Sequence, residues 1–254
     1  MTTVGLLYPG QAAEDDFPRI EVMLDSDIRV PLFHTEADED ARTVEALRTA
    51  GAPERLAAGV EELRMAGAES LVWASTGGSF AFGWDGGHEQ IATLARAAGL
   101  PASSASFAFV HAVRELGASR VAVAASYPED LAALFAGFLE SGGIEVTATR
   151  GGGLIKASDA AAADLELVKE LAVAGDHPDA EVVVLPDNAL HTAAYVPELE
   201  ELVGKPVLTA NQVAVWEGLR LADRRIWAPT LGTLFATREP PLGAAEPRGI
   251  EVRE

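Results

Sequence analysis

Two stretches of the chain, AESLVWAST at residues 68–76 and AEVVVLPDN at residues 180–188, follow the same pattern. Each is a short apolar segment that ends in small polar residues, Ser75-Thr76 in the first and Asp187-Asn188 in the second. Apolar runs of this length, bounded by polar residues, are typical of strands buried on both faces. The two stretches therefore predict equivalent strands, each followed by a polar loop.

Two further echoes occur around these stretches in the same order. A proline-led strand follows each one, LPASS at 100–104 and KPVLT at 205–209, and LLYP at 6–9 resembles ASYP at 125–128. One such match would carry no weight, but three in the same order favour an internal duplication.

Short apolar segments alternate with longer segments of helical period along the whole chain, which is typical of βαβ units and parallel sheets. Together with the duplication, this alternation predicts an α/β protein with two pseudo-symmetric lobes and a cleft between them. The first lobe is expected to contain residues 1–105 and about 212–238, the second 106–211, and 239–254 a flexible tail. The expected strands are 4–8, 28–33, 70–74, 102–104, 121–125, 144–148, 182–185 and 207–209. The expected helices are 40–50, 53–66, 87–98, 106–116, 128–141, 159–174 and 211–222.

The duplication also predicts where a ligand binds. In open α/β sheets, ligands sit outside the carboxyl ends of the strands. Two lobes related by a pseudo-twofold axis place equivalent strand-end loops opposite each other. We therefore expect the Ser75 loop and the Asp187 loop to face each other across the cleft.

Composition excludes several classes of function. The 254 residues carry a formal net charge of −20, which argues against nucleic acid and anionic membranes as partners. The chain has no cysteine, so thiol nucleophiles, disulfides and cysteine-bound metals are absent. Neither a signal peptide nor a bilayer-spanning segment is visible, and we expect a cytoplasmic protein that forms a homo-oligomer.

Several motifs together resemble one family. They are VGLLYPG at 4–10, WASTGGSF at 73–80, SYPEDL at 126–131, LPDNALHTA at 185–193, GKPVLTANQVAVWEGLRLA at 204–222 and GTLF at 232–235. This set resembles the aspartate/glutamate racemase superfamily, in the branch that contains maleate cis–trans isomerases and arylmalonate decarboxylases. The resemblance implies two pseudo-symmetric Rossmann-like, or flavodoxin-like, lobes with parallel sheets, an active site between them, and no metal or organic cofactor.

The chain departs from that family at its reactive positions. The resemblance implies a cysteine at two equivalent loop positions, of which decarboxylases keep only the second. Here the two positions hold Ser75 and Asp187. Serine is a weak nucleophile unless a base activates it, so neither a covalent thioether nor a two-thiol racemisation can operate.

The remaining polar groups near these positions are candidates for binding a carboxylate. The loop that contains Ser75, Thr76, Gly77 and Gly78 offers hydroxyls and accessible backbone N–H groups, which favours anion binding over the alternative of a tight turn capped by Ser or Thr. The resemblance implies that this loop and Tyr127 bind the substrate carboxylate. Tyr127 alternatively only covers the end of the sheet.

Asp187 is the candidate catalytic residue, with Ser75 as its counterpart in the other half. A carboxylate at a strand end in a partly apolar cleft can act as a general base, and Asp is also a favoured N-cap for a helix over residues 189–194. On such a helix, His191 would share a face with Asp187, although a solvated surface histidine is the commoner case.

Other residues are weaker candidates for the pocket. Asn188 follows Asp187, Asn211 is either an N-cap or a pocket residue, and Gln11 follows the first strand. No metal is expected, because His34, Asp85 and His88 have no diagnostic ligand spacing.

Three functions follow from this pattern. The first is a cofactor-independent isomerase or decarboxylase that acts at the carbon next to a carboxyl group of a small carboxylate or dicarboxylate, with Asp187 as acid–base group. The second is a hydrolase of hydantoin-like or thiohydantoin-like cyclic amides, in which Asp187 activates water with help from His191. The third is a small-molecule binder without catalysis.

Overall fold

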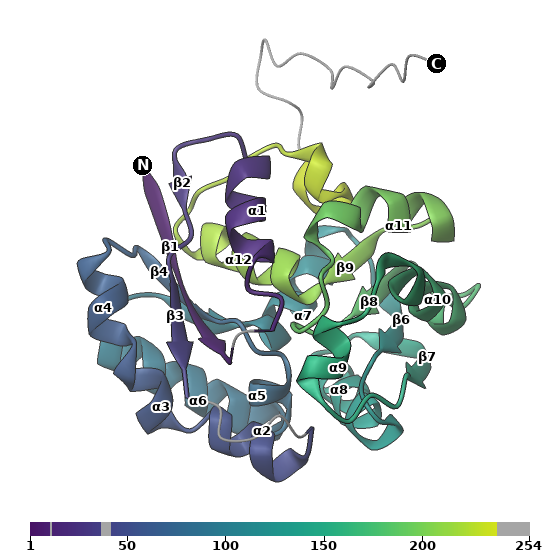
Figure 1. Ribbon diagram of the computed structural model, residues 1–254, viewed down its shortest axis with the longest axis horizontal. Coiled ribbons are helices and arrows are strands. Elements are labelled where there is room, and N and C mark those ends of the chain that lie inside the picture. Colours follow the sequence, from purple (N-terminus) through teal and green to yellow (C-terminus); the bar gives the residue numbers. More distant parts are fainter. Residues whose placement is uncertain (11, 37–41, 238–254) are drawn as a thin grey trace.

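The computed structural model describes residues 1–10, 12–36 and 42–237 and contains two parallel sheets (Figure 1). The first has the strand order β2-β1-β4-β5, with β3 also paired to β1. The second has the order β7-β6-β8-β9. Their strands are β1 Thr2–Pro9, β2 Ile28–Arg29, β3 Leu32–Thr35, β4 Ser70–Trp73, β5 Ala102–Ser104, β6 Arg120–Ala125, β7 Glu145–Gly151, β8 Val182–Leu185 and β9 Val207–Thr209.

Helices surround both sheets, and Figure 1 shows α1 and α12 on one side of the first sheet with α3, α4 and α6 on the other. Around the second sheet, α8 packs against β7, α10 against β6 and α11 against β9. The helices are α1 Asp16–Met23, α2 Val44–Ala50, α3 Pro53–Ala58, α4 Val60–Met65, α5 Gly77–Phe80, α6 Gly83–Ala98, α7 Ala105–Glu115, α8 Glu129–Ser141, α9 Ala157–Ala161, α10 Leu165–Gly175, α11 Val196–Val203 and α12 Ala210–Leu221. Short 3-10 turns cover Ala193–Tyr195, Pro229–Leu231 and Thr233–Ala236.

The predicted α/β fold with two similar lobes is confirmed. All pairings in both sheets are parallel, and the orders β3-β1-β4-β5 and β7-β6-β8-β9 place corresponding strands in corresponding positions. β4 and β8 occupy the same four positions of the two matching stretches that predicted them. Both strands are fully buried and, apart from Ser70 of β4, apolar, as expected for strands covered on both faces.

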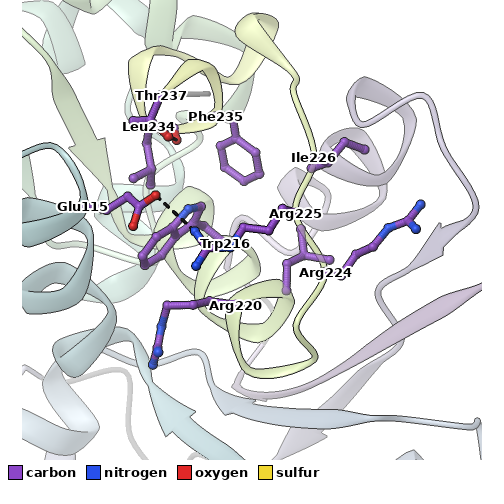
Figure 2. Close-up of a pocket in the computed structure, with 10 residues that line it drawn as sticks. Glu115, Trp216, Arg220, Arg224, Arg225, Ile226, Leu234, Phe235 and Thr237 are labelled. Atoms are coloured by element: carbon purple, nitrogen blue, oxygen red, sulfur yellow. Dashed lines mark hydrogen bonds and ion pairs between the residues drawn. The ribbon is translucent and has the colours of Figure 1, made fainter. Parts of the chain in front are cut away.

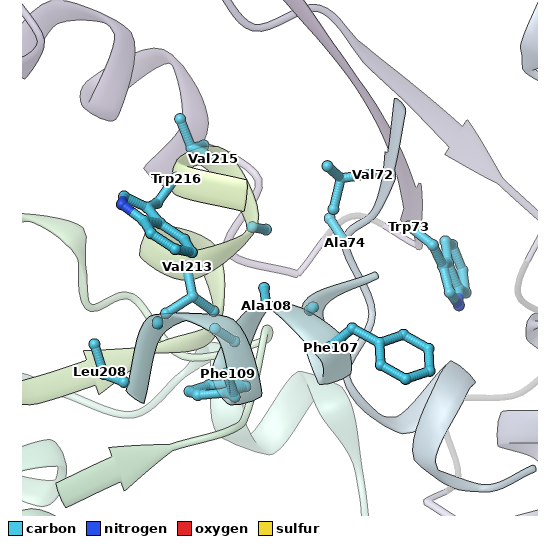
Figure 3. Packing of buried hydrophobic residues seen from close by; sticks show 14 of the residues in the cluster. Val72, Trp73, Ala74, Phe107, Ala108, Phe109, Leu208, Val213, Val215 and Trp216 are labelled. Carbon is cyan, nitrogen blue, oxygen red and sulfur yellow. The ribbon is translucent and has the colours of Figure 1, made fainter. Parts of the chain in front are cut away.

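The two lobes meet through equivalent helices, α7 and α12, which pack against each other. Figure 3 shows this contact: Ala108 and Phe109 of α7 lie near Val213 of α12 in the shared core. α12 also packs on β4 and β5 of the first sheet, so the chain crosses back after completing the second sheet.

Several expected elements differ in detail. The expected strand 28–33 is two strands, because Pro31 lacks the N–H that a continuous ladder needs. The expected helix 53–66 is interrupted at Gly59, where a Cβ would lie 2.3 Å from Phe33 Cδ1. The expected helix 159–174 is divided, because Asp164 begins a new helix and accepts a hydrogen bond from the Leu167 N–H at 3.0 Å.

Other differences concern elements that the pattern did not predict, namely α1, α5 and α11, which are short. The described part of the expected helix 40–50 begins at Val44, after Thr43 as N-cap. The predicted tail at 239–254 lies outside the described residues. Within the described helices, none has the length and apolarity needed to cross a bilayer.

Candidate active site

A cavity of about 610 Å³ lies at the carboxyl ends of the strands, and residues from both lobes line it. Ser75 and Gly77 after β4 contribute to one side, and Asp187 and Asn188 after β8 contribute to the other. The two strand-end loops that the duplication predicted to face each other therefore share one cavity. Tyr127, which follows β6, also lines it.

The cavity has a polar part and an apolar part. Arg42 and Asp187 are the only charged side chains among its described lining residues. The apolar part consists mainly of side chains from α2, α8, α9 and the residue after α9: Ala46, Leu47, Ala50, Leu131, Ala157, Ala161 and Ala162. A ligand that fits both parts combines a charged or polar group with an apolar body.

Asp187 is buried at the polar end, with 2% of its side chain exposed. Its Oδ2 accepts a hydrogen bond from Arg42 Nη2 at 2.5 Å and another from the Ser126 hydroxyl. Its Oδ1 accepts from the Ala189 N–H at 2.9 Å. The carboxylate is thus held in one orientation by two side chains and one backbone group.

Arg42 is a functional candidate that the sequence pattern did not reveal. Its side chain is 5% exposed, and besides Asp187 it donates to Ser126 Oγ at 3.0 Å and to the Leu154 carbonyl at 3.4 Å. Its guanidinium carbon lies 5.1 Å from the centroid of the Tyr127 ring, a distance typical of a cation–π contact. No local signal marks Arg42, because its partners lie far away in the sequence.

Tyr127 forms the floor beneath this ion pair. Burial and the negative charge of Asp187 raise the pKa of Tyr127 well above its ordinary value. The phenol is therefore protonated, and it donates to the Pro186 carbonyl at 2.9 Å. Tyr127 faces the cavity, as expected, but its hydroxyl also holds the loop that carries Asp187.

Tyr8 plays the corresponding part in the other half of the repeat. Its hydroxyl lies 2.7 Å from the Asn188 carbonyl, and burial raises the pKa of Tyr8 well above its ordinary value. The echo between 6–9 and 125–128 therefore relates two tyrosines that both hold the loop after β8. That echo is the signal by which the sequence could have identified Tyr8.

The first loop combines the two roles proposed for it. Ser75 lines the cavity, and its Oγ also accepts from the Gly78 N–H of α5 at 3.1 Å, which closes the turn at the start of that helix. Gly77 lines the cavity, whereas a Cβ on Gly78 would lie 2.5 Å from Trp73 Nε1. Gly78 is therefore required by the packing of Trp73. Thr76 is buried and is not part of the cavity lining.

The residues around His191 do not form the expected helix. Residues 188–190 form a turn, and Asp187 accepts from Ala189 within it instead of capping a helix. His191 Nδ1 lies 3.0 Å from Asp15 Oδ1, and His191 is not among the lining residues. The expected shared helical face of Asp187 and His191 is therefore wrong.

Asn211 supports the site from behind. Its Nδ2 donates to Asp16 Oδ2 at 3.1 Å and lies 3.2 Å from the Asn188 carbonyl. Asp16 also accepts from the Thr192 N–H at 3.0 Å, and burial raises the pKa of its carboxyl group. Asn211 is neither the N-cap of α12, which is Thr209, nor part of the lining. Gln11 lies outside the described residues.

The three residues considered for a metal do not come together. His34 pairs with Glu14, and the His88 ring packs at 4.3 Å from Phe107 and 4.8 Å from Trp84, measured between centroids. In the described ranges, no group of three or more His, Asp or Glu side chains is arranged to hold a metal ion.

A second cavity, of about 20 Å³, lies beside α12 (Figure 2). Its arginines are already paired with carboxylates: Arg225 with Glu115 at 3.1 Å, Arg224 with Asp27 at 2.8 Å, and Arg220 with Glu217 at 2.7 Å. It is too small for an organic substrate. The large cavity is therefore the candidate active site.

Comparison with known proteins identifies the family. The model of the family described as arylmalonate decarboxylase matches residues 44–235. The chain belongs to the arylmalonate decarboxylase family. A curated arylmalonate decarboxylase from Bordetella bronchiseptica is 31% identical over 145 residues, which are 56% of this chain and 60% of that protein.

Solved structures of the same branch share the fold of this family member. The maleate isomerase Iso from Pseudomonas putida S16 superposes with a TM-score of 0.84 at 20% identity, covering 92% of this chain and 98% of that one. An arylmalonate decarboxylase gives 0.72 at 25% identity, covering 92% and 98%. A variant of the Nocardia farcinica maleate cis–trans isomerase, with a covalently bound succinylcysteine intermediate, gives 0.84 at 21% identity, covering 94% and 99%.

These comparisons confirm the resemblance seen in the motifs. They also sharpen the departure, because this member of the family contains no cysteine that could form such an intermediate.

Proposed function

We propose that the protein is a cofactor-independent enzyme of the isomerase or decarboxylase type that acts at the carbon next to a carboxyl group of a small carboxylate. In this proposal Asp187 is the acid–base group. Ser75, Tyr127 and Arg42 stabilise the negative charge that develops on the carboxylate. Such charge stabilisation by groups already in position is the largest catalytic effect available to a site of this kind.

The observation that carries the proposal is the position of Asp187. It is a buried carboxylate at a strand end, in a cavity that both lobes line and that contains one cation and a large apolar surface. The relatives of the whole chain are enzymes named as isomerases and decarboxylases. A carboxylate can transfer a proton without a thiol, so the loss of cysteine does not remove acid–base chemistry.

The hydrolase alternative has less support. It used His191 to assist Asp187, but the described contacts place the imidazole against Asp15. A binder without catalysis would not need a charged pair in a fixed orientation, since an ion pair removed from water is costly to maintain.

The test is turnover of a panel of α-substituted monocarboxylates, malonates, maleate and hydantoins. The readouts are exchange of the α-hydrogen in deuterated water, release of carbon dioxide, and uptake of labelled water oxygen. We expect exchange or carbon dioxide release on at least one substrate, reduced about 100-fold or more in Asp187→Asn. Asp159→Asn, an exposed residue of α9, is the control for the charge change.

Two results would contradict the proposal. One is an Asp187→Asn variant as active as the parent on every substrate that is turned over. The other is uptake of labelled oxygen without α-hydrogen exchange or carbon dioxide release, which would support the hydrolase instead.

A further inference from the structure

The charges of the large cavity are balanced before any ligand enters. Among the described lining residues, Arg42 supplies the single positive charge and Asp187 the single negative charge. The two side chains are 5% and 2% exposed and bind each other at 2.5 Å. A ligand with one carboxylate therefore brings the charge of the occupied cavity to −1, and a ligand with two brings it to −2.

The surroundings disfavour a second negative charge. The described lining residues offer no second cation to pair with it, and transfer of a carboxylate without such a partner into largely apolar surroundings is costly. The net charge of −20 on the whole chain gives no compensating attraction for anions. Among the described lining residues, only Arg42 can therefore compensate the charge of a bound carboxylate.

Arg42 is suited to that contact. A guanidinium binds a carboxylate through two parallel N–H···O bonds, and the substrate's carboxylate has the same shape as that of Asp187. Breaking a buried ion pair is costly for an ion that is left without a partner, and a carboxylate ligand removes this cost for Arg42. Asp187 loses its cation in the exchange but keeps the hydrogen bonds from Ser126 and Ala189.

We infer that Arg42 binds the carboxylate of the substrate in exchange for Asp187, and that the cavity selects monocarboxylates with an apolar group on the α-carbon over dicarboxylates. This inference rests on the proposed function, because it assigns the substrate class of the same site. The apolar group lies against α2 and α9, and the carboxylate lies over Tyr127.

The exchange also couples binding to chemistry. Once Arg42 turns to the substrate, Asp187 keeps its contacts with Ser126 and Ala189, and the position on Oδ2 that Arg42 occupied becomes free to accept a proton. The α-proton then moves to Asp187, and the electron pair of the broken C–H bond moves into the carboxylate bound by Arg42. Return of the proton to the same carbon restores Asp187, and no co-reactant is consumed.

Binding can be tested without turnover by calorimetric titration at pH 8 with three ligands that share one ring. Phenylacetate is a monoanion, phenylmalonate a dianion, and phenylacetamide is neutral. We expect phenylacetate to bind at least tenfold more tightly than either of the others. Tighter binding of phenylmalonate than of phenylacetate would overturn the inference.

Variants separate exchange from a purely structural ion pair. Asp187→Asn releases Arg42, so phenylacetate should bind about tenfold more tightly, although the proposed function predicts loss of turnover in the same variant. Arg42→Gln should weaken phenylacetate at least tenfold and change phenylacetamide less than twofold. The control is Arg48→Gln, which removes a charge from an exposed side chain of α2 that donates to the Ala81 carbonyl.

The remaining outcomes are also decisive. If Arg42→Gln does not fold, the double variant Arg42→Gln/Asp187→Asn removes both charges and should bind phenylacetate no better than phenylacetamide. Unchanged or weaker phenylacetate binding in a folded Asp187→Asn variant would show that the pair is structural only. Because these are binding measurements, they can fail while α-hydrogen exchange succeeds, or succeed while it fails.

Discussion

At the scale of single residues, the site depends on a contact between side chains 145 positions apart. Arg42 and Asp187 meet across the cavity, and Ser126 lies between them, donating to Asp187 and accepting from Arg42 at 3.0 Å. A hydroxyl in this position satisfies both charged groups at once. Without the Ser126 hydroxyl, the Arg42 guanidinium and the Asp187 carboxylate would each lose one hydrogen-bond partner.

Removal of the Ser126 hydroxyl should therefore destabilise the fold. Ser126→Ala leaves a buried donor and a buried acceptor without this partner, and we expect a loss of about 1–3 kcal/mol in the free energy of unfolding. Urea denaturation measures the change. Ser141→Ala is the control, because its hydroxyl bonds only to the Gly137 carbonyl one turn earlier and is exposed. Equal stability of the two variants would show that Ser126 does not support the pair.

At the scale of elements, α7 and α12 are joined by charge as well as by apolar packing. Glu217 of α12 is fully buried and binds His111 of α7 at 2.9 Å and Arg220 at 2.7 Å. Burial alone would raise the pKa of Glu217, but the hydrogen bonds from Arg220 and His111 outweigh it and lower the pKa to about 2. The carboxylate therefore stabilises the contact between the two helices.

The pH dependence follows from that direction. The pKa of Glu217 is lower in the folded state, about 2, than its ordinary value of 4.5. Its contribution is therefore complete above pH 4.5 and is lost as the pH falls toward 2. Glu217→Gln should reduce the free energy of unfolding at pH 7 by a few kcal/mol, on the order of 3, with a deficit that shrinks below pH 4.5.

Urea denaturation at pH 7, 5, 4 and 3 measures this deficit. Glu89→Gln, an exposed residue of α6, removes the same charge without touching the contact and should show little effect at any of these values. A deficit for Glu217→Gln that is constant with pH would contradict the assignment.

At the scale of the whole molecule, the cavity exists only because two lobes face each other. α2 supplies one apolar wall and α9 another, from opposite halves of the chain. Substitutions in either α2 or α9 should therefore change which ligands the cavity binds. The cavity also differs from a packed core in that its alanines leave space that larger side chains can fill.

Filling this space should weaken ligand binding with little effect on stability. Ala161→Phe places a ring in the apolar part of the cavity, so we expect phenylacetate affinity to fall at least tenfold while the Tm changes by about 3 °C or less. Titration and thermal unfolding measure the two effects. Ala133→Phe, on the exposed face of α8, is the control. Unchanged affinity in Ala161→Phe would place the ligand elsewhere.

The sequence by itself determined the architecture, the duplication and the loops that meet at the cavity. Buried strands can be recognised from local apolar runs such as VVVL at 182–185. Equivalent positions in the repeat then identify the loops at the strand ends, and in this way Ser75, Tyr127 and Asp187 were found. The predicted bounds of strands and helices were wrong where a single residue interrupts an element, as Pro31 does between β2 and β3 and Gly59 between α3 and α4.

Only the tertiary structure decided which groups act together. Arg42 lies next to Asp187, His191 lies beside Asp15, and Asn211 lies behind the loop rather than in the pocket. These pairings join residues from different lobes, and no local periodicity or spacing encodes the distance between them. Apolar periodicity is a property of neighbouring residues, whereas the charge of a site is a property of its assembled walls.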